Sequence, residues 1–325
     1  MGVVRTENLK NPIGITQAAG FPSFPENWTF EPESFVSSDE KLKLFGMFMK
    51  KKPLEISGAD SCPKNVLVVV HGFGEHGGRY LHFPHYLENA VDGIYVYDQL
   101  GHGRSEGARG DAPDFDRYVQ DLARVLMRLY DRSPTTRFHL LGHSMGGHIA
   151  LRFMYLHPTF QLKTVQISAP WLKLVKNPSL PLRGVAKFLA YTYGTLSLAA
   201  EIDPMVLSRD ENVVEHYRAD RLNHSKMTPR LFDSVQKAIK DTLSRVEKSS
   251  EKLNYPIQFI IPGADTLIDS KTSTDFFEKL SAVEKKLVVL NEFRHESMND
   301  LGKEKFFDAV SAWIVGHESI SSVIQ

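Results

Sequence analysis

The sequence predicts an α/β fold, with a mostly parallel central sheet, helices on both faces of the sheet and a helical cap inserted between two strands. Short aliphatic runs such as Val66–Val70 are typical of strands buried on both faces. Amphipathic segments with helical spacing lie between these runs, as parallel strands require. A third observation is the segment Gly142–Gly146, which reads G-x-S-x-G between an expected strand and an expected helix. With 325 residues and 42% hydrophobic content, the chain can form a large core.

The first part of the chain is expected to lead irregularly into a hairpin. Residues 1–30 contain several prolines and glycines and little periodicity, so we expect an irregular leader. Phe30–Val36 and Leu42–Met49 flank the polar turn Ser37–Glu40, and apolar residues alternate along the second segment, as in a hairpin strand. Further along the chain, buried strands are expected at Val66–Val70, Ile94–Tyr97, Phe138–Leu141, Lys163–Ile167, Ile257–Ile261 and Leu287–Leu290, and helices at 115–129, 148–154 and 303–314.

The segment Gly142–Gly146 has the pattern of a nucleophile elbow, a sharp turn that presents a serine between a strand and a helix. The glycines two residues before and after Ser144 leave room for such a strained turn. Serine is a weak nucleophile at its own pKa, so the motif predicts a base and an acid elsewhere in the chain. Because five-residue matches also occur in plain turns, these partners decide whether the motif is catalytic.

Two loops after the serine offer the expected partners. Asp265 and His295 each follow an expected strand, and the order Ser144, Asp265, His295 is that of a known serine-hydrolase triad. His295 would take the proton of the serine hydroxyl, and Asp265 would fix the imidazole tautomer. Asp269 is the rival acid, but we expect it to cap a helix that begins near Ser270.

A glycine-rich loop follows Val66–Val70 and reads HGFGEHGGRY from His71 to Tyr80. We expect the backbone N–H of Phe73 to serve an oxyanion hole, with the second donor at Met145. No Gly-Lys-Ser/Thr follows, which excludes a P-loop, and Asp98 alone gives little support to nucleotide binding. Two histidines, Arg104 and Asp98 crowd these strand-end loops, and the histidines lack the spacing of zinc ligands, so we expect a polar network that braces the loops. As catalytic bases, His71, His76, His102 and His143 are disfavoured, because all four precede the serine.

No segment typical of a buried strand occurs between Trp171 and Lys252. Val185–Tyr193 and Leu196–Ala200 are apolar segments that we expect to be helical, and Leu231–Arg245 is a charged one. The apolar segments would contact a membrane or lipid droplet, pack against the core or line an acyl tunnel. Their polar face is not rich in Lys or Arg, which disfavours membrane contact. The expected division is a leader at 1–30, a core at 31–170 and 253–325, and a helical cap, or lid, over the serine at 171–252.

Composition excludes several other classes of protein. Lys and Arg number 39, as do Asp and Glu, so the formal net charge is zero and nothing indicates nucleic-acid binding. We expect no transmembrane span and no signal peptide, because no apolar run is long enough. The single Cys62 excludes an intramolecular disulfide, so we expect a cytoplasmic protein. Met1–Thr6 fits the short N-myristoylation pattern.

Taken together, these segments resemble the monoacylglycerol lipase and lysophospholipase group of serine hydrolases, which have the α/β-hydrolase fold. The likeness covers about residues 35–316. Four features carry it: HGFGEHGGRY at His71–Tyr80, GHGRSEG at Gly101–Gly107, GHSMG at Gly142–Gly146, and the loops that hold Asp265 and His295. The sequence departs from the usual family pattern after the histidine, where Glu296 follows, which predicts a different alcohol pocket.

The resemblance implies cleavage of monoacylglycerols to fatty acid and glycerol through an acyl-enzyme on Ser144, without metal or cofactor. It also implies that Glu75 and Arg79 hold the glycerol end of a lipid substrate. Lysophospholipase activity stays open, because Trp171, Lys173 and Lys176 could serve a choline or phosphate headgroup. General carboxylesterase or transacylase activity uses the same triad. A catalytically silent binding protein is disfavoured, because all three triad residues are present.

Overall fold

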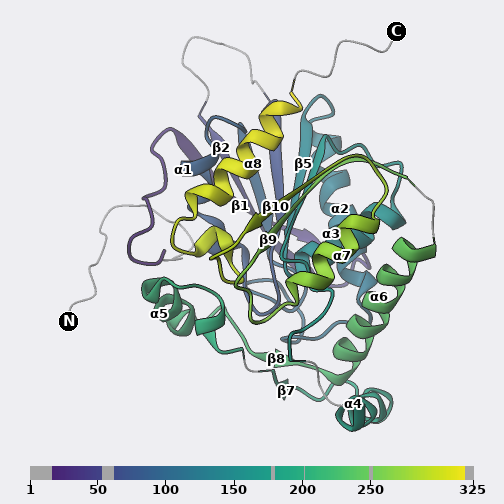
Figure 1. The fold of residues 1–325 in the computed structure, drawn as a ribbon. Coiled ribbons are helices and arrows are strands. Elements are labelled where there is room, and N and C mark those ends of the chain that lie inside the picture. Colours follow the sequence, from purple (N-terminus) through teal and green to yellow (C-terminus); the bar gives the residue numbers. More distant parts are fainter. Residues whose placement is uncertain (1–16, 53–61, 177–179, 201, 249–251, 319–325) are drawn as a thin grey trace.

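The structure of the chain is a computed structural model in which a twisted sheet runs through the molecule (Figure 1). The eight strands follow the order β1-β2-β4-β3-β5-β6-β9-β10. The hairpin β1–β2 pairs antiparallel with β4, and the other neighbours are parallel. This arrangement confirms the predicted mostly parallel sheet. The structure describes residues 17–52, 62–176, 180–200, 202–248 and 252–318.

The bounds of the elements agree with the expected core elements to within a few residues, although β9 and β10 extend further than predicted. The strands are β1 (Trp28–Val36), β2 (Lys43–Lys51), β3 (Asn65–Val70), β4 (Gly93–Tyr97), β5 (Arg137–His143), β6 (Thr164–Ser168), β7 (Leu198–Ala199), β8 (Lys226–Met227), β9 (Leu253–Pro262) and β10 (Ala282–Leu290). The helices are α1 (Phe83–Leu87), α2 (Asp116–Arg132), α3 (Met145–Leu156), α4 (Leu180–Thr192), α5 (Glu211–Ala219), α6 (Pro229–Lys248), α7 (Ser270–Lys279) and α8 (Glu304–Gly316). Three short 3-10 helices are η1 (Gly77–Tyr80), η2 (Pro204–Val206) and η3 (Ser297–Asn299).

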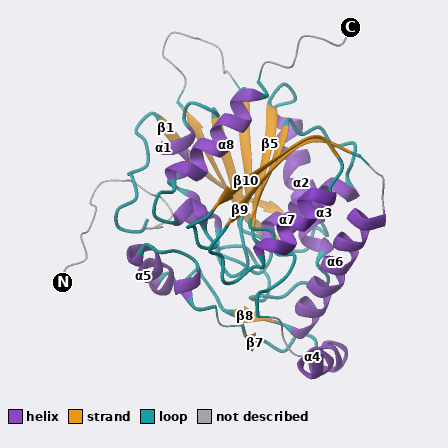
Figure 2. Cartoon of the chain, viewed as in Figure 1, coloured by secondary structure: helices purple, strands orange, loops and turns teal. Residues whose placement is uncertain are grey.

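Helices cover both faces of the sheet (Figure 2). Helices α2, α3, α6 and α7 contribute to one apolar cluster with the sheet, and α1 and α8 contribute to a second cluster on the opposite face. Strand β3 is buried along its whole length, as its uninterrupted aliphatic run predicted. In α2, Leu122, Val125 and Leu129 are buried on one side, which confirms the predicted amphipathic helix. The sheet is therefore a rigid platform whose carboxyl edge can hold a site.

The chain between β6 and β9 leaves the sheet and forms α4, β7, α5, β8 and α6 (Figure 1). The expectation of a helix at Leu196–Ala200 is wrong, because Leu198 and Ala199 pair with β8. The N–H of Ala200 also donates to the carbonyl of Ser225 at 2.6 Å, so this segment satisfies backbone groups by pairing with the β8 region rather than by a helical turn. We call residues 171–252 the insertion.

The leader ends earlier than expected, because β1 begins at Trp28. The N-myristoylation pattern Met1–Thr6 lies outside the described residues. Cys62 is exposed and free. Within the part of the chain that the structure describes, no helix has both the length and the apolar character needed to cross a membrane.

Candidate active site

Ser144 lies between β5 and α3 with φ 54° and ψ −115°, a conformation that residues with a side chain rarely adopt. The flanking glycines make this turn possible. A Cβ on Gly146 would lie 2.0 Å from the carbonyl oxygen of Val70, and a Cβ on Gly142 would lie 2.3 Å from that of Gly146. Any side chain at either position would therefore collide with backbone, which is the steric reason inferred from the motif.

Ser144, His295 and Asp265 form a continuous line of hydrogen bonds. The Nε2 atom of His295 lies 2.9 Å from Ser144 Oγ, and its Nδ1 atom lies 2.7 Å from Asp265 Oδ2. Asp265 Oδ1 accepts the backbone N–H groups of Leu267 at 2.8 Å and Ile268 at 2.9 Å. A carboxylate held in this way keeps the proton on Nδ1, so Nε2 is free to accept the proton of the serine.

The rival acid has a different task. Asp269 caps α7 by accepting the N–H of Thr272 at 3.1 Å, and it pairs with Lys173 at 2.6 Å. Only Asp265, of the two carboxylates, contacts His295. The structure thus brings together the three residues expected from chain order and leaves Asp269 at the helix end where it was predicted.

The electrostatics of the site favour a protonated His295 during reaction. Burial lowers the pKa of His295, but the carboxylate of Asp265, with smaller contributions from Glu296 and Glu75, raises it above its ordinary value. The site therefore stabilises the imidazolium that forms when the serine gives up its proton.

The two expected oxyanion donors lie on segments that adjoin Ser144. Met145 is the first residue of α3, so the helix offers its N–H no carbonyl partner. Phe73 lines the same cavity as Ser144, and a Cβ on the preceding Gly72 would lie 3.2 Å from the Cβ of Ser144. This close approach suits two N–H groups that act on one oxygen, and the oxyanion hole remains a prediction.

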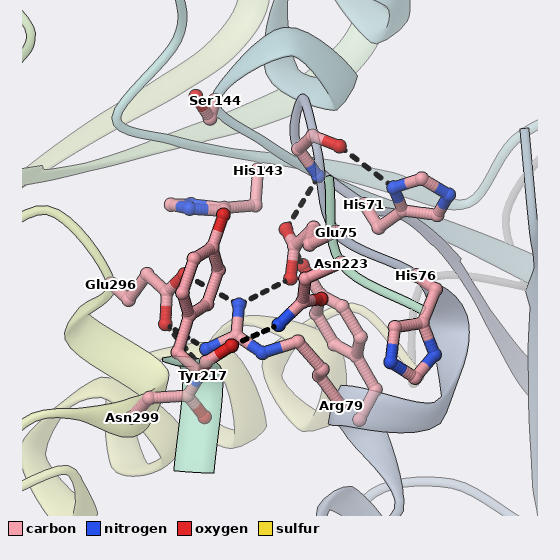
Figure 3. Close-up of polar contacts among 12 residues, drawn as sticks. His71, Glu75, His76, Arg79, His143, Ser144, Tyr217, Asn223, Glu296 and Asn299 are labelled. Carbon is pink, nitrogen blue, oxygen red and sulfur yellow. Dashed lines mark hydrogen bonds and ion pairs between the residues drawn. The ribbon is translucent and has the colours of Figure 1, made fainter. Parts of the chain in front are cut away.

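A buried ion-pair cluster lies next to the triad (Figure 3). Two nitrogens of Arg79 donate to the two oxygens of Glu296, each at 2.6 Å, and Arg79 also donates to Glu75 at 2.8 Å. Glu75 Oε1 accepts the N–H of Gly72 at 2.6 Å and the hydroxyl of Tyr80 at 3.0 Å. The cluster therefore connects the loop that carries Phe73 to the loop that carries His295. Burial raises the pKa of Glu75, whereas the guanidinium outweighs burial at Glu296 and lowers its pKa to about 2.

The family resemblance implies that both Glu75 and Arg79 hold the alcohol end of the substrate, but in the structure the two residues have different positions relative to the cavity. Glu75 lines the cavity, but Arg79 is not among the lining residues because its donors are directed at two carboxylates. Arg79 can act on a substrate only through these neighbours. Glu296 lines the cavity as well. Its position directly after His295 was the signal in the sequence, but its partner 217 residues away could not be read from the chain.

A cavity of about 520 Å³ opens onto Ser144. Four of its polar side chains, Glu75, His143, Tyr217 and Glu296, lie together and form what we call the polar side (Figure 3). Lys176, Asp203 and Thr266 also line the cavity. The remaining wall is mostly apolar and comes from the insertion and from the loop between β9 and α7: Trp171, Leu174, Ala200, Ile202, Val206, Leu207, Met227, Phe232, Leu267 and Ile268.

One group among the described residues has the composition of a metal site. Ligand atoms of Glu75, His143 and Glu296 all lie within 4.8 Å of one another. Arg79 already contacts both carboxylates and supplies the positive charge that a metal would supply. The donor set thus fits an ion pair better than a metal, and the triad chemistry calls for neither metal nor cofactor.

The loops near the serine hold a polar network, as expected. His71 Nε2 accepts the N–H of Gln99 at 3.0 Å. Asp98 accepts the N–H groups of Gly77 and Arg104, each at 2.7 Å. His76 differs from the expectation of a purely local brace, because its Nε2 lies 2.8 Å from Asp220 in the insertion. The glycine-rich loop is therefore tied to the insertion as well as to the sheet. His102 contacts the carbonyl of Leu100 at 2.9 Å, and His143 contacts Ser168 at 3.3 Å.

Comparison with known proteins identifies the family of this chain. A family model described as serine aminopeptidase, S33, matches residues 61–302. Monoglyceride lipase of Mus musculus is 30% identical over 254 residues, which cover 78% of this chain and 82% of the mouse protein. An uncharacterized abhydrolase domain-containing protein of Dictyostelium discoideum is 26% identical over 258 residues; these cover 78% of this chain but 26% of that longer protein.

Solved structures show the same fold. The crystal structure of Paleococcus ferrophilus monoacylglycerol lipase matches with a TM-score of 0.70 and 26% identity, covering 89% of this chain and 100% of that one. These findings confirm the α/β-hydrolase fold and the ester-hydrolase class expected from the sequence. The chain therefore belongs to the serine aminopeptidase S33 family of α/β-hydrolases and is a relative of the monoglyceride lipases.

Proposed function

We propose that this chain hydrolyses monoacylglycerols to a free fatty acid and glycerol through an acyl-enzyme on Ser144. The observation that carries the proposal is the line of hydrogen bonds from Ser144 through His295 to Asp265 at the wall of a large, mostly apolar cavity. Relatives named monoglyceride lipase and monoacylglycerol lipase support the substrate class.

The reaction follows from the contacts. Ser144 Oγ attacks the ester carbonyl while its proton passes to Nε2 of His295, and Asp265 stabilises the imidazolium. The N–H groups of Phe73 and Met145 donate to the oxyanion. When the intermediate collapses, the bond between acyl carbon and alcohol oxygen breaks, and the leaving alcohol takes the proton from His295. Water then attacks the acyl-enzyme by the same route, which releases the fatty acid and restores the serine.

The two sides of the cavity match the two parts of a monoacylglycerol. The apolar wall suits the acyl chain, since burying each CH₂ contributes about 0.8 kcal/mol. The polar side suits an alcohol rich in hydroxyl groups, because Glu75 and Glu296 offer acceptors there. A lysophospholipid is the rival substrate, because Trp171 and Lys176 also line the cavity.

The insertion would act as a cap that delivers the lipid. It supplies much of the apolar wall, and its α4 region exposes large apolar side chains such as Phe188, which is 64% exposed, and Tyr191, which is 92% exposed. Exposed aromatic and aliphatic groups of this kind suit contact with a membrane or lipid-droplet surface. A cytoplasmic enzyme working at such a surface is the location we propose.

The test is hydrolysis of a substrate panel by purified wild type and Ser144→Ala. The panel holds monoacylglycerols of several chain lengths, lysophosphatidylcholine, a diacylglycerol and a short aryl ester. We expect the highest turnover on a monoacylglycerol and a loss on the order of 10⁴-fold or more in Ser144→Ala. Ser34→Ala, which changes an exposed serine on β1, is the matched control and should keep wild-type turnover.

Each contrary outcome points to a different error. Near-wild-type turnover by Ser144→Ala would overturn the whole site assignment. Serine-dependent activity on the short ester alone would keep the triad and discard the lipid substrate. Highest turnover on lysophosphatidylcholine would replace the monoacylglycerol with the rival substrate.

A further inference from the structure

We propose that Glu296 is a specificity-determining residue. Together with Glu75 it makes the alcohol side of the cavity anionic, so that the site takes neutral or cationic alcohol groups and rejects anionic headgroups. This inference rests on the proposed function, because it identifies which alcohols the same site accepts.

The charges of the polar side do not balance. Glu75 and Glu296 face one guanidinium, that of Arg79, so two negative charges and one positive charge leave one net negative charge. Both oxygens of Glu296 accept from Arg79. Both oxygens of Glu75 also accept from donors, which include the N–H of Gly72 and the hydroxyl of Tyr80. A carboxyl group surrounded only by donors is best satisfied when it is ionised. Burial raises the pKa of Glu75, but Arg79, the N–H of Gly72 and the hydroxyl of Tyr80 all act in the opposite direction and favour its carboxylate.

The geometry turns the negative charges toward the substrate and the positive charge away. Glu75 and Glu296 line the cavity, whereas Arg79 is buried behind them. The ring of Tyr217 covers the guanidinium at 4.8 Å (Figure 3). A phosphate that entered this side would meet carboxylates in a buried, low-dielectric setting before it could reach Arg79. Like charges repel strongly in such a setting.

A cation elsewhere in the cavity does not offset this charge. Among the described residues that line the cavity, Lys176 is the one lysine or arginine, and it is exposed. It lies two residues after Leu174, which pairs with Ile268 on the apolar wall. We therefore expect a headgroup beside Glu296 to lie away from Lys176. By contrast, a quaternary ammonium would find two carboxylates and the ring of Tyr217.

The experiment compares three esters that share one acyl chain: a neutral monoacylglycerol, the anionic lysophosphatidate and a cationic acylcholine. All are presented at the same low mole fraction in neutral detergent micelles, so that the charged substrates change the surface charge of the micelle little. For the wild type, we expect kcat/KM for lysophosphatidate to be roughly 100-fold below that for the monoacylglycerol, and acylcholine to lie within about tenfold of it. Glu296→Gln should raise the ratio of lysophosphatidate to monoacylglycerol by about tenfold.

Two further variants separate charge from structure. Glu296→Asp keeps the negative charge and should keep a ratio near that of wild type, whereas a merely structural role would make Asp and Gln behave alike. Glu215→Gln removes an exposed charge from α5 outside the cavity and should leave the ratio unchanged.

The outcomes distinguish this inference from the function on which it rests. Equal hydrolysis of lysophosphatidate and monoacylglycerol by wild type, or an unchanged ratio in Glu296→Gln, overturns the inference while serine-dependent monoacylglycerol hydrolysis leaves the function intact. If wild type cleaves no lipid ester in the set, both fail. If Glu296→Gln does not fold, the ratio of lysophosphatidate to monoacylglycerol hydrolysis in the wild type and in Glu296→Asp still tests the inference.

Discussion

On the core side of the cavity, Ser144, His295 and Glu296 are buried and each has a fixed partner. On the insertion side, α4 exposes Phe188 and Tyr191 to solvent. The contrast follows from what each side must do. Proton transfer needs atoms held within hydrogen-bond distance, whereas a lipid chain needs an apolar wall and a route to it. Under the proposed function, the core side would therefore determine the chemistry, and the insertion side would determine access.

The insertion itself is not uniform. Helix α6 is tied to the core, because Arg152 of α3 pairs with Asp241 at 2.9 Å and His148 contacts Thr242 at 3.1 Å. Helix α4 packs against α6. The boundary between the rigid and the exposed half thus lies within the insertion, between α4 and α6, rather than at its junction with the core.

The sharpest test of the core side replaces each of the two candidate acids with asparagine in a separate variant. Asp265→Asn should lower kcat by about 10⁴-fold, because the amide no longer holds His295 in the required tautomer. Asp269→Asn should cost less than about threefold, since this side chain caps α7 and contacts Lys173 at a partly exposed position. Kinetics on a soluble short ester would measure both. A severe loss in Asp269→Asn with normal Asp265→Asn would exchange the two roles.

The next test uses pH, which should act on the core side alone. His295 must be neutral to accept the serine proton, and its pKa is raised above the ordinary 6.5. The acid limb of kcat/KM should therefore have its midpoint above pH 6.5 and fall about tenfold for each pH unit below that midpoint. The profile would be recorded from pH 5 to 9. A midpoint at or below 6.5 would contradict the assigned influence of the neighbouring carboxylates.

The raised pKa of His295 affects the stability of the fold in the opposite direction from its effect on activity. A histidine whose pKa is raised in the folded protein adds stability that is fully present below its unfolded pKa and is lost as the pH rises through the folded value. Loss of activity in mild acid would thus not come from unfolding driven by His295. Circular dichroism recorded across the same pH range provides the control.

The smallest effect is expected on the insertion side. The double change Phe188→Ser and Tyr191→Ser removes exposed apolar surface without touching the triad. Activity on monoacylglycerol in vesicles should fall by a few-fold, roughly three- to tenfold, while activity on a soluble short ester stays constant. Vesicle sedimentation of the inactive Ser144→Ala form provides a direct measure of binding. Equal losses on both substrates would show that these side chains support the fold rather than a lipid surface.

The two sides also differ in how far they could be predicted. The core strands could be predicted because aliphatic runs such as Val66–Val70 mark buried strands, and candidates for the triad could be named because the elbow motif limits where its partners can stand. In the insertion, β7 and β8 have two residues each, too few to show a period of two. Leu196–Ala200 is apolar enough for either structure, and only its partner strand decides between them.

Within the site, the sequence does not show which side chains far apart in the chain contact one another. Glu75 and Arg79 were recognised by resemblance, but the resemblance could not show that Arg79 turns away from the cavity. That orientation depends on Glu296, which another loop brings into contact. A single sequence carries the identity of each partner but not the distance between them.

The pairing of Arg79 with Glu296 also has a consequence for folding during synthesis. It joins positions 217 residues apart, and the contact between Ser144 and His295 spans 151. Contacts so far apart in sequence form late, because loop closure must precede them. If Ser144 is the nucleophile and His295 its base, as we propose, a chain emerging from the ribosome exposes the first long before the second is made. We therefore expect the nascent chain to have no hydrolytic activity until β10 and the loop that follows it are in place.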